Sequence, residues 1–271
     1  MGLKNIATEL EFFIKGYTDK KWLQDRNCHI WDKWANIDSW RPVYDTNLRH
    51  YCQNNNIKEP SQELKEKIQN EAMNNTRDLG PIYGWQWRHF GGEYKWNPKK
   101  PTENFNPKKP GIDQLATVIE TAKKDPNNRR LIVSAWNPTD QGKMALPPCH
   151  VMHQILIHNG KLNLIWTQRS CDMFLGIPYN IASYALLLLL YAKELGYKPG
   201  ILRGELHDVH IYENHISQVK EQLKREPYKL PTVSLTDSPW CFSNMLEWSA
   251  AYGFTLKDYI CHEKLTGEVA R

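Results

Sequence analysis

Apolar residues recur at helical spacing in several parts of the chain. Between Ile6 and Ile14 they return every three or four positions, which predicts a helix over residues 5–17 that stops at Gly16. The longest apolar run lies within residues 178–196, after Pro178, and reads as a buried helix. Further helices are predicted over residues 20–27, 59–76, 112–125 and 216–227.

Runs of β-branched and apolar residues predict strands elsewhere. Asn159-Gly160 separates two such runs within residues 153–170, and this dipeptide is the strongest short-range signal for a β-hairpin. Helical and strand segments mix without strict alternation, so the predicted fold class is α+β. Further strands are predicted over residues 129–136, 201–215 and 248–264.

Two polar segments interrupt this pattern. Residues 41–76 are nearly free of apolar runs and read as an insertion carrying one exposed helix, while residues 97–110 repeat NPKKP and read as a surface loop. We expect both to be solvent-exposed additions to a single domain, 1–271, although a length of 271 residues suits one large domain or two small ones.

Composition and charge limit the classes of protein. No apolar run reaches the roughly 20 residues of a membrane span, and the N-terminus lacks the layout of a signal peptide, so we expect a cytoplasmic protein with no membrane contact. The six cysteines include no C-x-x-C pair, which argues against a metal site and a disulfide framework. A net charge of +5 fits anionic small molecules or weak RNA binding. Two interpretations of the tryptophan clusters in residues 30–40 and 84–96 stay open: they pack in the core, or they line a pocket for a flat ligand.

The segment MALPPCHVMHQ, residues 144–154, raises a chemical question. Pro147 and Pro148 fix the backbone just before Cys149, which would aim its thiol, although a lone cysteine is more often a small buried apolar residue. His150 follows directly, and neighbours along a strand point to opposite faces, so the two do not form a Cys–His dyad. A cysteine protease needs a histidine that points toward its nucleophilic cysteine, so this arrangement also argues against that class of enzyme.

Five segments in this order resemble the thymidylate synthase family: DLGPIYGWQWR, RRLIVSAWNP, MALPPCH, QRSCDMFLGIPYNIASYALL and HIYENH. The resemblance runs from about Leu3 to the last residues. It implies a three-layer α+β fold in which a large, mostly mixed β-sheet packs with helices and dimerises through the sheet. It also implies a transferase that reductively methylates dUMP to dTMP. The cosubstrate is 5,10-methylenetetrahydrofolate, which donates the carbon unit and hydride and leaves as dihydrofolate; no metal is expected.

The resemblance assigns roles to individual residues. Cys149 matches the nucleophile, a thiolate that adds to carbon 6 of uracil so that carbon 5 can attack the one-carbon unit. Asn180 matches the residue that reads the uracil amide edge, since an amide side chain offers a donor and an acceptor. The full expected catalytic set is Cys149, Glu9, Arg169, Asn180, Tyr83 and Trp31. The dUMP set is Arg129, Arg130, Gln168, Arg169, Ser170, Asp172, Asn180, His210 and Tyr212. The folate set is Ile30, Trp31, Trp34, Asp172 and Ala270.

The same resemblance implies a partner chain, and it also shows where this sequence differs from the family pattern. Arg129 and Arg130 match phosphate ligands that act in trans, which implies a homodimer. An N-terminal segment of roughly fifty residues that the family carries is missing here, so we expect a truncated domain. Arg271 departs from the small apolar residue with which family chains end, and loose closure would let water compete with hydride. Two alternatives therefore stay open: a dUMP hydroxymethylase of the same fold, and an inactive fragment that only binds nucleotide or RNA.

Overall fold

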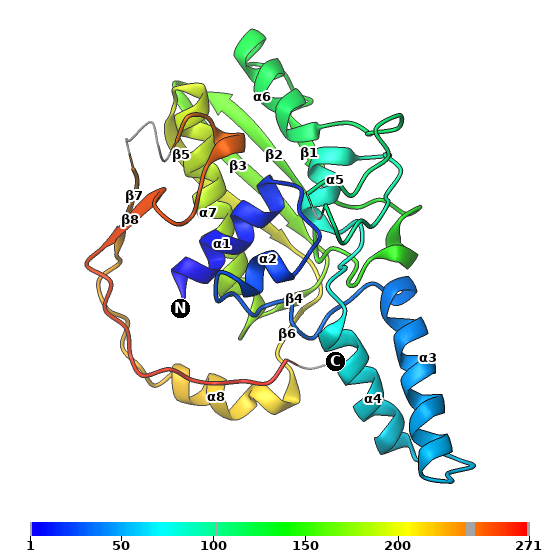
Figure 1. Cartoon of the computed structure of the whole chain (residues 1–271). Helices are drawn as coiled ribbons and strands as arrows, with labels where there is room; N and C mark the ends of the chain where they lie inside the picture. The colour runs from blue at the N-terminus through cyan, green and yellow to red at the C-terminus, as the bar shows by residue number, and fades with distance from the viewer. Residues whose placement is uncertain (1, 101, 237–241, 270–271) are drawn as a thin grey trace. The chain divides into compact units, whose positions relative to one another are not determined.

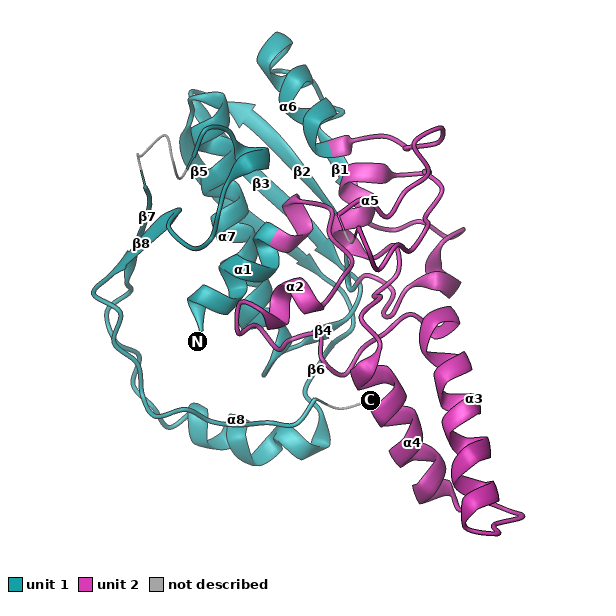
Figure 2. Cartoon of the chain, in the orientation of Figure 1, with its two compact units in different colours: residues 1–11, 115–133, 149–271 teal, residues 12–114, 134–148 magenta. Residues whose placement is uncertain are grey.

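The computed structural model describes residues 2–100, 102–236 and 242–269. The chain forms two compact units, each built from segments distant in sequence (Figure 2). Unit 1 comprises Met1–Glu11, Leu115–Val133 and Cys149–Arg271, and unit 2 comprises Phe12–Gln114 and Ser134–Pro148. The single domain expected over the whole chain stays a prediction.

A four-stranded sheet forms the centre of unit 1, in the order β1-β2-β3-β5. β2 pairs antiparallel with β3, and β3 pairs parallel with β5, so the sheet is mixed. Helix α7 lies against β3 and β5 (Figure 1). The strands are β1 (Ile132–Ser134), β2 (His150–His158), β3 (Lys161–Gln168) and β5 (Lys198–Leu206), and α7 spans Gly176–Leu195. The α+β class is confirmed, although the largest sheet among the described residues has four strands and is smaller than expected.

Apolar side chains from the helix and the sheet form the core of this unit. Leu187 and Leu190 of α7 are buried, as are Ile155 of β2 and Leu164 of β3. Ile155 and Leu164 are register partners across the antiparallel pair, so they share one face of the sheet. Burying such side chains contributes roughly 1.5–3 kcal/mol each, which makes this face the main stabilising contact of the sheet.

The predicted hairpin is confirmed by its backbone. Asn159 and Gly160 have φ values of 50° and 71°, both in the left-handed region that a tight two-residue turn requires. Gly196 follows the last residue of α7 with a φ of 74°, as a helix C-terminus commonly demands. The helix begins at Gly176, earlier than predicted, so Pro178 lies inside its first turn.

Shorter elements complete unit 1. The two-residue strands β4 (Cys171–Asp172) and β6 (Val209–His210) pair in parallel, and β7 (Thr232–Leu235) pairs antiparallel with β8 (Phe254–Lys257). The long strand predicted over residues 201–215 is therefore divided, and Tyr212 lies beyond β6 rather than on it. The remaining helical pieces are α1 (Leu3–Ile14), α6 (Gln114–Lys124), η2 (Glu213–His215), α8 (Ile216–Gln222) and η3 (Met245–Glu247).

A helical hairpin is the main feature of unit 2 (Figure 1). Helices α3 (Ile37–Asn54) and α4 (Gln62–Asn75) pack on each other and bury Trp40 against Ala72 and Met73. The helix predicted over residues 59–76 is confirmed as α4, but it is not fully exposed, because the few apolar positions of this polar stretch pack against a second helix, α3, that was not predicted. Unit 2 also contains α2 (Lys21–Gln24), α5 (Tyr83–His89) and η1 (Gln141–Lys143).

The NPKKP segment lacks helix and named strand, as predicted for residues 97–110 other than the undescribed position 101. Contacts with other residues of unit 2 nevertheless hold this segment in place. Asn104 is buried and donates from Nδ2 to Oγ1 of Thr18 at 2.6 Å, and Tyr94 bridges to Phe105. None of the described helices is long and apolar enough to cross a membrane.

Candidate functional site

The thiol-bearing residue lies directly beside a cationic one. Cys149 precedes β2 and Arg169 follows β3, and the Arg169 backbone N–H donates to the Cys149 carbonyl oxygen at 2.8 Å. The register His150–Gln168 extends the antiparallel pairing up to this point. Cys149 is partly exposed, and Arg169 is exposed. The backbone hydrogen bond therefore places a potential nucleophile and a cationic residue side by side at the end of the β2–β3 pair.

Gln168 fixes the side chain of Asn180. Its Nε2 donates to Oδ1 of Asn180 and to the Ser170 carbonyl oxygen, each at 3.0 Å, while its Oε1 accepts from Nε1 of Trp166 at 3.2 Å. Gln168 is buried, so these bonds hold it in one orientation. Asn180 lies in the second turn of α7, not at its N-cap, and its amide is oriented by the neighbouring strand.

A second pair of site residues meets on the short parallel strands. Asp172 of β4 is the register partner of His210 of β6. The Asp172 carboxylate accepts from the Phe174 backbone N–H at 3.0 Å, and Nδ1 of His210 lies 2.8 Å from the Asp208 carbonyl oxygen. The Tyr212 ring stands edge-on to His210 with centroids 4.9 Å apart. The expected nucleotide residues that follow β3 and β5 are thus brought together within unit 1.

His150 is buried behind the thiol and is unsuited to act as a base. Burial lowers its pKa to about 3, and its Nδ1 lies 2.9 Å from the Tyr184 hydroxyl. Its neighbour His153 is also buried with a pKa lowered to about 3, and its Nε2 lies 3.1 Å from the Tyr191 hydroxyl. Both imidazoles are therefore neutral at pH 7, which agrees with the expectation that His150 is a structural neighbour of Cys149.

Arg129 and Arg130 lie in the turn before β1 and are exposed. With Asp125, Asn127 and Asn128 they line an open hollow of about 500 Å³. The turn is held by hydrogen bonds to its backbone: Gln154 Nε2 donates to the Arg129 carbonyl oxygen at 3.1 Å, and the Arg130 N–H donates to Oδ1 of Asn128 at 2.9 Å. Both guanidinium groups therefore project from an ordered turn toward solvent.

The first helix carries two glutamates with different environments. Glu9, the expected acid or base, is partly exposed on α1. Glu11 is buried, and its Oε2 accepts from the Ala250 backbone N–H at 2.8 Å. Sequence reasoning did not single out Glu11, because a charged residue in a helix is usually solvated.

Three of the expected folate residues, Ile30, Trp31 and Trp34, lie in unit 2, where Trp31 is part of an aromatic cluster, whereas Asp172 lies on β4 of unit 1. The Tyr83 ring stacks on Phe13 with centroids 5.0 Å apart, and Trp31 meets Tyr83 and Phe13 edge-on at 5.9 and 6.3 Å. Trp31 and Tyr83 are buried, Trp34 is partly exposed and Ile30 is exposed. Ala270, also expected in this set, lies outside the described residues. No group of three or more histidine, cysteine, aspartate or glutamate side chains among the described residues is arranged to hold a metal ion.

Comparisons with known proteins agree with the motifs. The family model described as thymidylate synthase matches residues 1–271. A thymidylate synthase of the Aster yellows witches'-broom phytoplasma is 39% identical over 100% of this chain and 83% of its own length, and one of Mycoplasma genitalium is 41% identical over 95% and 80%. A bifunctional dihydrofolate reductase-thymidylate synthase of Paramecium tetraurelia is 38% identical over 98% of this chain. The chain spans 50% of that longer relative.

Proposed function

Because this chain belongs to the thymidylate synthase family, a family of methyltransferases, we propose that it converts dUMP to dTMP with 5,10-methylenetetrahydrofolate as cosubstrate and releases dihydrofolate. The observation that carries the proposal is the placement of Cys149 next to Arg169 at the meeting point of β2 and β3. Among the residues expected to bind the nucleotide, Arg169, Ser170 and Asp172 follow β3, and His210 and Tyr212 follow β5, all within unit 1.

Carbon 5 of uracil is a poor nucleophile until a thiolate adds to carbon 6. Cys149 would supply that thiolate. Pro148 is buried directly before it, so the approach of the backbone is fixed. Arg169 and Ser170 would also donate to the nucleotide phosphate, which prefers several charged or polar donors.

Asn180 would select the base. Its Oδ1 accepts from Gln168, which fixes the orientation of the amide, and in this proposal the amide would donate to O4 and accept from N3–H of uracil. An aspartate here would lack a donor, and family relatives with aspartate use deoxycytidylate. Asp172, His210 and Tyr212 would hold the pterin and the sugar hydroxyl. Glu9, Tyr83 and Gln168 would serve proton transfer.

The folate would use the aromatic residues of unit 2. Trp31 offers a rigid indole braced edge-on by Tyr83 and Phe13, and Ile30 and Trp34 flank it in the same loop. Flat pterin rings bind well to such aromatic surfaces. In this proposal the tryptophans of the loop form a binding surface for the folate, and the assignment of Ala270 to the folate set stays a prediction.

The proposed assembly is a homodimer formed through the sheet. One face of the sheet packs on α7, while on the other face Ile201 of β5 is 70% exposed and Ile165 and Met152 are only partly buried. Apolar side chains left in contact with water among the polar residues of this face, such as Gln154 and Arg203, favour a second copy of the chain. Arg129 and Arg130 of one protomer would then bind the phosphate held by its partner. RNA binding through the basic surface would be weak and dependent on salt.

One experiment tests the proposal directly. Release of tritium from dUMP labelled at carbon 5, measured with methylenetetrahydrofolate, should match dihydrofolate formation mole for mole. Release without dihydrofolate would identify a hydroxymethylase, and absence of release would leave a nucleotide-binding protein. Cys149→Ser is the matched control and should abolish both signals.

A further inference from the structure

Lys20 is an unusual residue of unit 2 because its ammonium group is buried. The side chain is 1% exposed, and Nζ donates to three backbone carbonyl oxygens: those of Asp32 at 2.8 Å, Trp34 at 2.9 Å and Met73 at 2.7 Å. A buried ammonium is very costly without such partners, so all three donors find an acceptor. Burial lowers the pKa of Lys20 to about 8, which still leaves the cation predominant at pH 7.

The three carbonyls come from two segments with different roles. Asp32 and Trp34 belong to the loop between α2 and α3, which carries Trp31. Met73 lies in the last turn of α4, where its carbonyl oxygen also accepts from the backbone N–H of the C-cap residue Thr76 at 3.3 Å. The Lys20 side chain therefore joins the loop of residues 25–36, called the tryptophan loop below, to the end of the α3–α4 hairpin.

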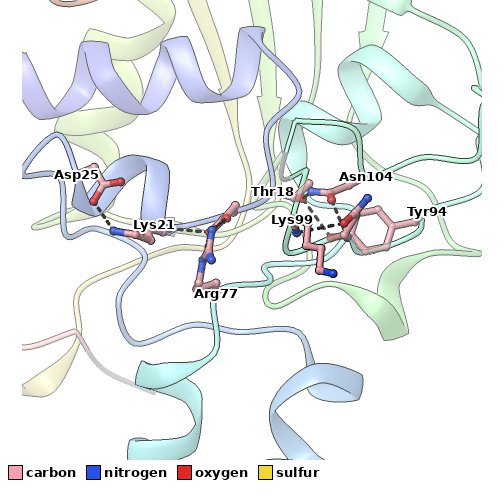
Figure 3. A network of polar contacts seen from close by, with 9 residues as sticks. Thr18, Lys21, Asp25, Arg77, Tyr94, Lys99 and Asn104 are labelled. Carbon is pink, nitrogen blue, oxygen red and sulfur yellow. Dashed lines mark hydrogen bonds and ion pairs between the residues drawn. The ribbon is translucent and has the colours of Figure 1, made fainter.

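The backbone beneath Lys20 is itself held firmly. Its N–H donates to the Arg77 carbonyl oxygen at 3.0 Å, and the preceding Asp19 forms an ion pair with the Arg77 guanidinium. Two positions before Lys20, Thr18 accepts from Tyr94 at 3.1 Å and from Asn104 at 2.6 Å (Figure 3). The ammonium thus projects from a fixed base rather than from a flexible turn.

The ends of the tryptophan loop have their own anchors. Asn36 donates through its N–H to the Asp78 carbonyl oxygen at 2.8 Å, and its side chain caps α3 by accepting from the Asp38 N–H at 3.0 Å. At the other end, the Cys28 N–H donates to the Leu23 carbonyl oxygen at 3.0 Å. Lys20 supplies two bonds to the middle of the loop, on either side of residue 33.

We propose that Lys20 is a positioning residue that holds the tryptophan loop in its binding conformation and couples it to the α3–α4 hairpin. The link to the folate rests on the function proposed above. Trp34 donates from its backbone N–H to the Trp31 carbonyl oxygen at 3.1 Å, so a displacement of the Asp32 and Trp34 carbonyls moves the turn that presents the Trp31 indole.

The test compares Lys20→Met with Lys21→Met. Methionine keeps the unbranched length of the side chain but removes all three donors. Lys21 is the adjacent lysine, is exposed, and pairs only locally with Asp25 at 2.6 Å (Figure 3), so its variant controls for loss of one charge. Hydrogen–deuterium exchange of the ligand-free full chain should show faster exchange in peptides covering residues 28–36 and 70–76 in K20M. K21M should match the wild type.

Steady-state kinetics supply the second readout. In K20M we expect KM for methylenetetrahydrofolate to rise about tenfold while KM for dUMP changes less than about twofold, because the nucleotide residues lie in unit 1. Lys20→Arg, which keeps charged donors, should recover part of the loss. If K20M does not fold, Lys20→Arg replaces it in both measurements, with smaller changes expected in the same two peptides.

The outcomes separate the two proposals. Folded K20M with unchanged exchange in both peptides overturns the positioning role. Faster exchange with an unchanged folate KM confines Lys20 to stability and overturns the link to the ligand. If the wild type shows no dUMP-dependent turnover, the proposed function fails, while the exchange data still decide whether Lys20 holds the loop.

Discussion

Mild acid should destabilise this protein through two histidines in the core of unit 1. The pKa values of His150 and His153 are lowered to about 3 by burial, whereas an unfolded histidine titrates near 6.5. Between these values the unfolded chain binds a proton at each position and the folded chain does not. Stability is therefore fully present above pH 6.5 and is lost as the pH falls toward 3.

The size of the effect follows from the linkage relation. Each histidine contributes about 1.4 kcal/mol per pH unit below 6.5, which is about 2 kcal/mol at pH 5 and about 4 kcal/mol for both. A typical domain is stable by only 5–15 kcal/mol, so half of the stability could disappear over this range. Urea unfolding followed by tryptophan fluorescence at pH 7, 6 and 5 measures the change.

A double variant isolates one of the two sites. His153→Phe together with Tyr191→Phe removes both the imidazole and the hydroxyl that it contacts, so neither group of this pair is left without the other. Its loss of stability between pH 7 and 5 should be smaller than the wild-type loss by about 2 kcal/mol. His158→Gln at the exposed end of β2 is the control and should leave the loss unchanged. An equal pH dependence in the double variant and the wild type would refute the reasoning.

Three further predictions concern the site and the fold. Asn180→Asp should lower kcat/KM for dUMP by at least about tenfold and raise it for dCMP, because the carboxylate keeps the acceptor for Gln168 but loses the donor; parallel assays with both nucleotides check this. Mixing inactive Cys149→Ser protein with weakly active Arg130→Ala protein should restore activity if the arginine acts in trans, and no recovery after refolding the mixture would argue for action within one chain. Gly196→Ala should destabilise the protein by about 1 kcal/mol, because the backbone φ there is 74° although a Cβ would meet no other atom. Gly142→Ala, where a Cβ also meets no other atom, is the control and should have little effect; thermal melting of both variants measures the difference.

Local periodicity was enough to predict the elements whose stability depends on local signals. The hairpin at Asn159-Gly160 and the helices that end near Gly16 and Gly196 were correct because turn and stop residues stand beside clear apolar periods. The α3 helix was missed because its residues are mostly polar. Its start depends on the Asn36 cap, and its packing depends on a partner helix that periodicity alone does not identify.

In the candidate site, too, some features could be predicted from the sequence and others required the structure. The order of the motifs identified the family correctly, and the residue assignments remain predictions. The bond between Gln168 and Asn180 joins a strand to a helix, and its geometry required the fold. Lys20 and Glu11 were overlooked because charged side chains usually remain in water. Their partners lie far along the chain, 53 residues away for one Lys20 bond and 239 residues away for Glu11.

The discontinuous make-up of the two units has a consequence for biosynthesis. Unit 1 takes its first segment from the N-terminus and most of its mass from residues after Cys149, and unit 2 is completed only by Ser134–Pro148. A ribosome therefore releases the first helix long before the strands of its own unit exist. During that interval residues 3–11 lack the later segments of their own unit, so chaperone binding to nascent chains should be strongest before β5, which ends at Leu206, has emerged.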